Sequence, residues 1–276
     1  MSQAFSTIAG AVVLKNKSQT EYIFDDSASP GSFGEAEMKM VVEKLPQMET
    51  QRLIFREVVF TPAMAHLLGP QLSNWHRLDV TQFEECTIPE ETWKAFSEHT
   101  QGNRFGKNIR IIAPKPKINP KSMEYIGLWL QSRCERIYLS EAFGPDKMGI
   151  VAQFKHLIYT QSILLPNNGL TGAEFGQLAS ELRYPGRWME VDLSDNPIDD
   201  KGLAALGEGL CHTFEHQYLL LAGTNVTGEG MENLLKGWNS DQSTYRNIKK
   251  LHFGSCAGFG DLGCVRLGKI IPACLS

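Results

Sequence analysis

A strand-and-helix pattern that recurs in a fixed register constrains the fold of this chain more than any other feature. The unit that begins at Val191 reads V-x-L-x-x-N-x-I, and leucines at helical spacing follow in 203–210. The segments that begin at Ile163 and Leu219 repeat both halves, and in all three the helical residues begin twelve positions after the strand. Because such a unit cannot bury its apolar faces alone, the recurrence predicts a stacked array.

The same offset of twelve predicts further units upstream. From three more strand starts, at Leu53, Thr81 and Ile111, the offset predicts nine inward-facing helix positions. Eight of the nine are apolar, whereas chance would give about four in a chain with 42% hydrophobic residues. Those positions are Ala65, Leu68, Leu72, Trp93, Phe96, Thr100, Met123, Ile126 and Leu130. The last unit is expected to bury Cys264, Leu267 and Ile271. The nine starts, spaced 26 to 32 residues apart, are Tyr22, Leu53, Thr81, Ile111, Ile137, Ile163, Val191, Leu219 and Leu251.

Composition and charge narrow the class of protein. The chain has 276 residues, 21% of them charged, and a formal net charge of -4, which supplies no global field for nucleic acid or an anionic membrane. An apolar stretch at 4–14 has no preceding Lys or Arg, so it is interpreted as an edge strand rather than a signal peptide. Six scattered cysteines without a CxxC motif predict reduced thiols and a cytoplasmic protein.

The pattern L-x-L-x-x-N/C-x-L, with a full helix and a period near 28, resembles the leucine-rich repeat of the ribonuclease-inhibitor-like subtype. The resemblance covers roughly 20–272 and is strongest in 163–236. It implies an α/β solenoid, a horseshoe of about nine repeats with a concave parallel sheet and convex helices. We expect a single domain over 1–276, with an N-terminal cap at 1–21, repeats over about 22–272 and a C-terminal end at 273–276.

The family's Asn or Cys position bonds the backbone of neighbouring turns. The residues able to do so here are Cys86, Asn168, Asn196, Thr224 and Cys256, whereas Val58 and Pro116 cannot, so local irregularity is expected at those two.

The non-leucine strand positions are expected to face outward from the concave sheet. Six of nine residues in the middle column are apolar or aromatic, which is typical of a protein-binding surface, although packing under a curved sheet would produce the same pattern. Two interpretations of Phe143 are open: it contacts a partner beside Tyr138, or it packs against its own loop and so staples that loop in place. The predicted partner-binding set is Ile54, Arg56, Glu84, Ile112, Lys115, Lys117, Tyr138, Phe143, Leu164, Asp192, Asp195, Leu220 and His252.

The segment 104–121 carries six Lys or Arg residues and no acid, and Lys115 and Lys117 are expected on the concave side. Such a run is usually a solvated surface. The alternative is a cationic spot that meets an acidic protein or a phosphate group. Without stacked aromatic residues beside it, the segment does not favour a nucleic-acid groove.

Motifs that elsewhere carry catalysis lack their context. GFGDLG at 258–263 matches a dinucleotide fingerprint, but too few residues follow for a second strand. GSCAG at 254–258 has the spacing of a nucleophile elbow, yet the repeat register places Cys256 inside. His212 and His216 have metal-site spacing without the Glu of HExxH. We therefore predict a protein that is not an enzyme and has no cofactor, metal or catalytic residue.

These observations predict a protein-interaction module that binds a partner protein on its concave sheet as an inhibitor, adaptor or regulator, with no nucleic acid or membrane as partner. The resemblance implies ribonucleases, small GTPases or host proteins as partners, the last for a pathogen-delivered effector acting in the host cytosol. One alternative is a GTPase-activating regulator using Arg56 or Asn167. Another is a hydrolase using Cys256.

Overall fold

The computed structural model describes residues 12–16, 19–44, 50–72, 75, 77–99, 108–131, 134–181, 188–210, 217–238 and 249–274. It divides into two compact units, an N-terminal unit over 1–146 and a C-terminal unit over 147–276. The expectation of one domain stays a prediction. Within the described residues, no helix is both long and apolar enough to cross a bilayer.

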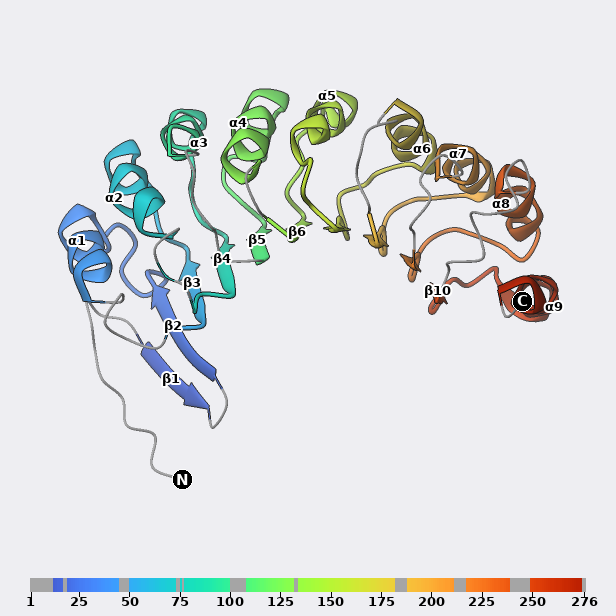
Figure 1. Ribbon diagram of the computed structural model, residues 1–276, viewed down its shortest axis with the longest axis horizontal. Coiled ribbons are helices and arrows are strands. Elements are labelled where there is room, and N and C mark those ends of the chain that lie inside the picture. Colours follow the sequence, from blue (N-terminus) through green and yellow to red (C-terminus); the bar gives the residue numbers. More distant parts are fainter. Residues whose placement is uncertain are drawn as a thin grey trace. The chain divides into compact units, whose positions relative to one another are not determined.

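The N-terminal unit alternates strands and helices. Its strands are β1 (Val12–Asn16), β2 (Gln19–Asp25), β3 (Arg52–Arg56), β4 (Val80–Glu84), β5 (Asn108–Ile112) and β6 (Arg136–Ser140). Its helices are α1 (Glu35–Lys44), α2 (Pro62–Leu72), α3 (Glu90–Ser97) and α4 (Pro120–Leu130). β1 pairs antiparallel with β2, and β2 to β6 pair in parallel in chain order. The described helices of this unit lie on one side of its sheet (Figure 1).

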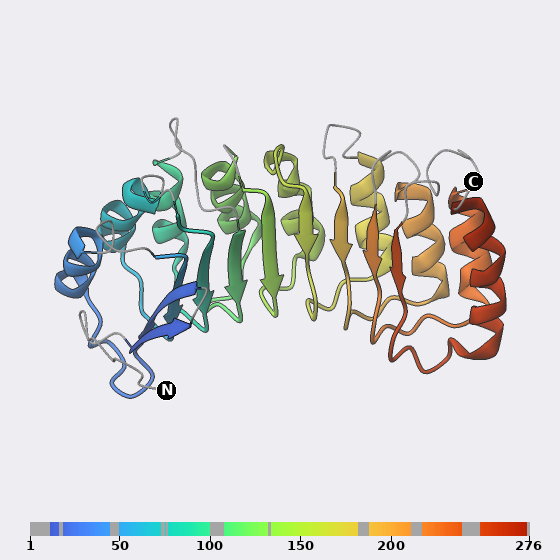
Figure 2. The same cartoon turned by 60° about the horizontal axis from the view of Figure 1, so that its bottom comes forward.

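The C-terminal unit follows the same order with shorter strands. It begins with α5 (Lys147–Val151) and the 3-10 helix η2 (Ala152–His156). Its strands are β7 (Ser162–Leu164), β8 (Glu190–Asp192), β9 (Tyr218–Leu220) and β10 (Lys250–His252), all parallel to their neighbours within the unit. Its further helices are α6 (Gly172–Glu181), α7 (Asp200–Leu210), α8 (Gly230–Trp238) and α9 (Gly260–Cys274). Figure 2 shows the strands of each unit side by side in front of their helices.

The interiors are filled by the residues that the repeat pattern assigns to them. In the N-terminal unit, Phe55 stacks between Phe24 and Phe83 at centroid distances of 5.4 and 5.8 Å, so equivalent positions of three strands form one aromatic column. In the C-terminal unit, Leu193 and Leu221 are fully buried. The α/β leucine-rich-repeat solenoid predicted from the sequence is therefore confirmed as the fold class.

Polar side chains at the Asn position join neighbouring repeats. Asn196 accepts hydrogen bonds from the backbone N–H groups of Asn168 (3.0 Å) and Leu170 (2.9 Å), and it donates to the carbonyl of Leu165 (2.8 Å). The thiol of Cys256 donates to the carbonyl of Leu221 at 3.1 Å. These side chains satisfy buried backbone groups where the strands end, which is the role that the resemblance implies.

The predicted start of the fourth repeat at Ile111 is wrong by two residues. Ile109 pairs with Thr81 on one side and with Ile137 on the other, so the repeat begins at Ile109. Its Asn position is consequently Pro114 rather than Pro116. The middle outward column contains Arg110, and Ile112 moves to the next outward column.

The backbone conformation confirms the corrected register. The fifth residue of every repeat from β3 onward has a positive φ between 45° and 65°, and these residues are Glu57, Glu85, Ala113, Glu141, Asn167, Asp195, Gly223 and Ser255. The error arose because the loop after β5 is longer: α4 begins eleven residues after Ile109, whereas α2 and α3 begin nine residues after Leu53 and Thr81. A fixed offset therefore placed the helix correctly and the strand two residues late.

The last repeat departs from the predicted interior. Cys264 on α9 is exposed and Leu267 is only half-buried, while the neighbouring Val265 is 63% exposed. The described part of the chain places one helix, α8, against α9. A helix packed against a neighbouring helix on one side only leaves apolar positions of its other side exposed.

Candidate protein-binding face

The sheet of the N-terminal unit has one face toward its helices and one face that no described helix covers (Figures 1 and 2). We call the second face the open face. Its side chains come from alternate positions of β2 to β6, in three columns that run across the strands. The middle column is Ile23, Ile54, Gln82, Arg110 and Tyr138.

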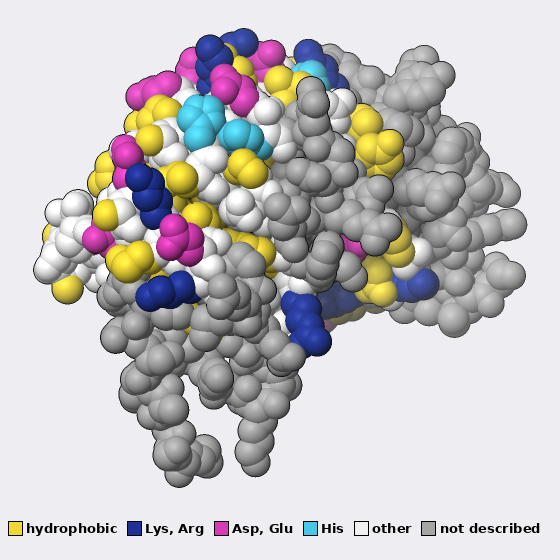
Figure 3. Space-filling model, turned by 60° about the vertical axis from the view of Figure 1, so that its left-hand side comes forward, with side chains coloured by type: hydrophobic (Ala, Val, Ile, Leu, Met, Phe, Trp, Pro, Cys, Tyr) yellow, Lys and Arg dark blue, Asp and Glu magenta, His cyan; other side chains and the backbone are white. Residues whose placement is uncertain are grey.

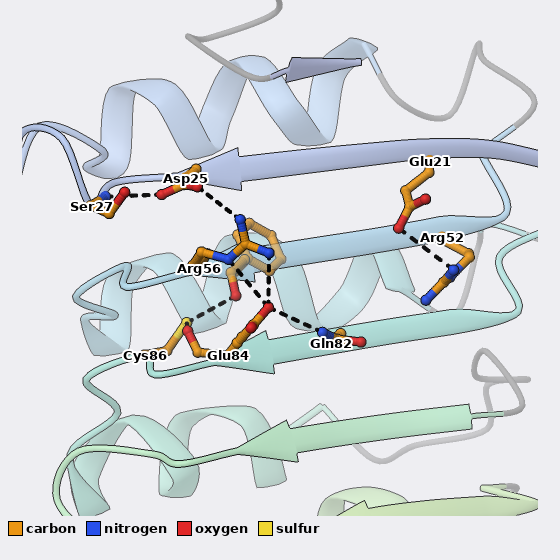
Figure 4. Close-up of polar contacts among 9 residues, drawn as sticks. Glu21, Asp25, Ser27, Arg52, Arg56, Gln82, Glu84 and Cys86 are labelled. Atoms are coloured by element: carbon orange, nitrogen blue, oxygen red, sulfur yellow. Dashed lines mark hydrogen bonds and ion pairs between the residues drawn. The ribbon is translucent and has the colours of Figure 1, made fainter. Parts of the chain in front are cut away.

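An ion-pair chain crosses the open face from β2 to β4 (Figure 4). Nη1 of Arg56 donates to Oδ2 of Asp25 at 3.0 Å, and its Nη2 and Nε donate to Oε2 of Glu84 at 3.2 and 3.3 Å. Gln82 donates to the same Glu84 oxygen at 3.3 Å. Arg52 pairs separately with Glu21 at 3.6 Å.

The charges of this chain stabilise one another. Hydrogen bonding to Asp25, followed by that to Glu84, raises the pKa of Arg56. Hydrogen bonding from Ser27 is the largest cause that lowers the pKa of Asp25, and Arg56 adds to it. All three nitrogens of the Arg56 guanidinium group already donate to carboxylates, so an Arg56 that reaches a nucleotide would first have to break these contacts. The geometry does not favour the GTPase-activating alternative for this residue.

On β5 and β6 the open face carries a cation–aromatic contact in place of the ion pairs of β2 to β4. The guanidinium carbon of Arg110 lies 4.6 Å from the centroid of the Tyr138 ring, and both residues are half-buried, as is Ile112. In the loop after β5, Nζ of Lys115 lies 3.6 Å from Oε2 of Glu85, and Lys117 donates to the carbonyl of Glu141. Both lysines are exposed.

Three residues of the predicted binding set are buried rather than exposed. Ile54 is 4% exposed, and Leu164 and Phe143 are 9% exposed. Neighbouring strands lie only about 4.8 Å apart, so side chains of one column cover one another. Phe143 lies in a loop whose backbone pairs with Ile118, which favours the interpretation that it staples its own loop. The burial of these three side chains favours the packing alternative at their positions.

The remaining members of the set reach solvent to different degrees. Arg56, Glu84, Ile112, Tyr138, Asp192 and Leu220 are half-buried, and Lys115, Lys117, Asp195 and His252 are exposed. Asp192 on β8 accepts a hydrogen bond from the backbone N–H of Ser194 at 2.9 Å. The structure brings together the members that lie in the N-terminal unit, on and beside β3 to β6.

The catalytic alternatives gain no geometric support. Cys256 is buried, and its sulfur lies 3.3 Å from Oγ1 of Thr224 as well as against the Leu221 carbonyl. The GFGDLG segment consists of the two residues before α9 and the first turn of that helix. His212, His216, Arg104 and Lys107 lie outside the described residues, and among the described ones no three His, Cys, Asp or Glu side chains form a possible metal site.

Sequence reasoning missed two features. One is Arg110, which a constant spacing of 28 residues from Thr81 to Ile137 would have placed in the middle column. The other lies on the helix side of the N-terminal unit, where His66 Nδ1 and His99 Nε2 are 2.9 Å apart; Figure 3 shows histidine side chains next to each other on this surface. No sequence signal joins these two histidines, because they come from successive repeats.

One repeat of the chain matches a family model, and the fold is similar to solved structures. The Leucine Rich repeat family model matches residues 189–207. The fold is similar to the crystal structure of the Rad7 and Elc1 complex in yeast, with 12% identity, 86% of this chain and 68% of that chain covered, and a TM-score of 0.49. It is also similar to an internalin (inlF) from Listeria monocytogenes, with 11% identity, 80% and 68% covered, and a TM-score of 0.36. A comparison with curated proteins finds no match.

The chain folds as a leucine-rich-repeat solenoid, and the repeat that the family model matches contains β8 and the first part of α7. The ribonuclease-inhibitor-like subtype stays a prediction.

Proposed function

We propose that this protein is a non-enzymatic interaction module that binds a partner protein on the open face of its N-terminal unit, around β4 to β6. The observation that carries the proposal is the half-buried pair Arg110 and Tyr138 on a sheet face that no described helix covers. Aromatic and Arg side chains of this kind are enriched among the residues that dominate binding energy at protein interfaces. The inhibitor, adaptor, regulator and delivered-effector roles would each use this same face.

A cytoplasmic location is part of the proposal. Among the described cysteines, Cys86, Cys134 and Cys256 are buried in the repeats, and the thiols of Cys86 and Cys256 bond to the backbone of the preceding repeat. Free thiols in structural positions are typical of proteins from reducing compartments. Ribonucleases and small GTPases remain partners suggested by resemblance alone.

The experiment is site-specific photo-crosslinking from the open face. A photoreactive phenylalanine analogue replaces Tyr138 in one variant and Tyr125, on helix α4, in a matched control; both positions are half-buried tyrosines of the same unit. We expect a protein from cell extract to crosslink to the Tyr138 variant and not to the control. Equal crosslinking from both positions, or crosslinking from Tyr125 alone, would contradict the proposal.

A charge substitution supplies a second measurement. Tyr138→Asp should reduce recovery of the crosslinked protein in a pull-down at least tenfold, since it removes an aromatic contact and introduces a carboxylate. Circular dichroism on the same variant separates a lost contact from a lost fold.

A further inference from the structure

The outward residues of the N-terminal unit divide into two groups of opposite charge. On β2 to β4 the outward carboxylates are Glu21, Asp25 and Glu84, and the cations Arg52 and Arg56 are paired with them. On β5 and β6 the outward positions are Asn108, Arg110, Ile112, Arg136, Tyr138 and Ser140. The first group therefore has one excess negative charge, and the second has two positive charges and no acid. We call the second group the cationic half.

Arg110 is the member of the cationic half whose donors are best placed for a ligand. It packs on the Tyr138 ring, and no carboxylate of the described residues lies within 4.0 Å of it. A guanidinium group held against an aromatic face keeps N–H donors at its edge in a planar fork that matches a carboxylate. Arg56, in contrast, already directs its nitrogens to Asp25 and Glu84.

A buried polar atom next to Arg110 also points to a ligand. Gln82 is the strand neighbour of Arg110 and is 8% exposed, and its Oε1 has no hydrogen-bond donor. A buried acceptor without a donor is costly, and native proteins leave few of them. A donor brought by a partner to the Gln82 and Arg110 position would satisfy it after a small rotation of the amide.

We propose that the partner presents an acidic peptide segment to the cationic half; this inference rests on the proposed function. A carboxylate of the segment pairs with Arg110, an apolar side chain covers Tyr138 and Ile112, and an N–H group of the segment donates to Gln82. A nucleic acid fits this surface less well, because Glu84 lies on the adjacent strand and would repel a continuous row of phosphates. A short segment with one or two acids avoids that repulsion.

The probe is a fluorescein-labelled peptide of about eight residues that alternates Glu with Leu and Tyr, long enough at about 3.3 Å per residue to cross this half of the sheet. Fluorescence anisotropy compares it with the same peptide carrying Lys in place of Glu and with a single-stranded DNA of equal charge. We expect the full-length protein to bind the Glu peptide, and an increase in salt concentration to weaken the complex.

Substitutions assign the binding to Arg110. Arg110→Glu should weaken the Glu peptide about tenfold or more, equivalent to about 1.4 kcal/mol, and Arg110→Lys should retain part of the affinity because the charge remains but the planar fork is lost. Lys94→Glu is the matched control, since it makes the same charge change at an exposed position on α3 of the same unit. It should leave the affinity unchanged.

Each contrary result overturns the inference in a different way. Equal losses in Arg110→Glu and Lys94→Glu would show a response to net charge alone, and tighter binding of the DNA would show a nucleic-acid surface. If the Glu peptide shows no saturable binding, or if the Lys peptide binds equally well, the proposal that the cationic half binds an acidic segment is wrong. If photo-crosslinking from Tyr138 still captures a protein in that case, the proposed function stands and only this inference fails.

Discussion

Replacing Asn196 by Ala tests how much the polar ladder contributes to the repeat fold. Asn196 is buried in the loop after β8. Its Oδ1 accepts hydrogen bonds from two backbone N–H groups, and the two N–H bonds of its Nδ2 are shared among three carbonyls, those of Leu165, Leu193 and Ser194. Alanine removes all five contacts and leaves the two N–H groups buried without acceptors. Each buried group that loses its partner costs about 1–3 kcal/mol.

The expected loss follows from those two donors, because the carbonyl groups tolerate an incomplete set of partners better than N–H groups do. Leaving two buried N–H donors without acceptors costs about 2–6 kcal/mol in total. We therefore expect a decrease of about 3–4 kcal/mol in the free energy of unfolding of the C-terminal unit. That is a large fraction of the stability of an ordinary domain. Asn196→Asp should also destabilise the unit at neutral pH, because a carboxylate cannot donate to the carbonyls.

The assay is urea denaturation combined with hydrogen exchange measured by mass spectrometry. Exchange should accelerate at the amides of Asn168 and Leu170, which donate to Asn196. Asn225→Ala is the matched control, because Asn225 is an exposed asparagine of the following repeat. A loss below about 1 kcal/mol, or a loss equal to that of the control, would refute the reasoning that this side chain joins the repeats.

Three further outcomes are expected. Arg56→Met should lower the free energy of unfolding by only about 0.5–1 kcal/mol in urea titrations, and less in high salt, because its ion pairs are partly exposed; a loss above about 3 kcal/mol would contradict this. Iodoacetamide should modify the exposed Cys264 in the native protein and spare the buried Cys256 and Cys86, since burial raises the pKa of Cys86 to about 12. Rapid modification of Cys256, assigned by mass spectrometry of its proteolytic peptide, would revive the hydrolase alternative. Desolvation, followed by the charge of the nearby His66, lowers the pKa of His99 in the folded state. As the pH falls, the unfolded chain therefore binds a proton at His99 before the folded chain does, and the free energy of unfolding decreases as the pH drops through about 6.5. His99→Asn should make the free energy of unfolding depend less on pH in this range, and an unchanged pH dependence would count against the assignment.

The sequence pattern predicted the helices and most of the buried core residues, and it placed the repeat start on strand β5 two residues late. Met123 and Ile126 on α4 are buried as the spacing of apolar residues predicts. In NIRII at 108–112, however, both Ile109 and Ile111 could begin a strand repeat. The pattern within one repeat does not distinguish them, because both residues face the interior and are buried. Pairing with the neighbouring strands decides between them.

Except in the last repeat, the sequence by itself determined which residues lie inside, because alternation along a strand and the 3.6-residue period of a helix are local properties. Only the tertiary structure decided which outward side chains remain accessible. Ile54 and Leu164 are covered by their neighbours, and Arg56 is paired with Asp25 and Glu84, 31 and 28 positions away in the chain. Accessibility and ion pairing depend on side chains of adjacent strands, which the stacking of repeats brings together and a single repeat does not contain.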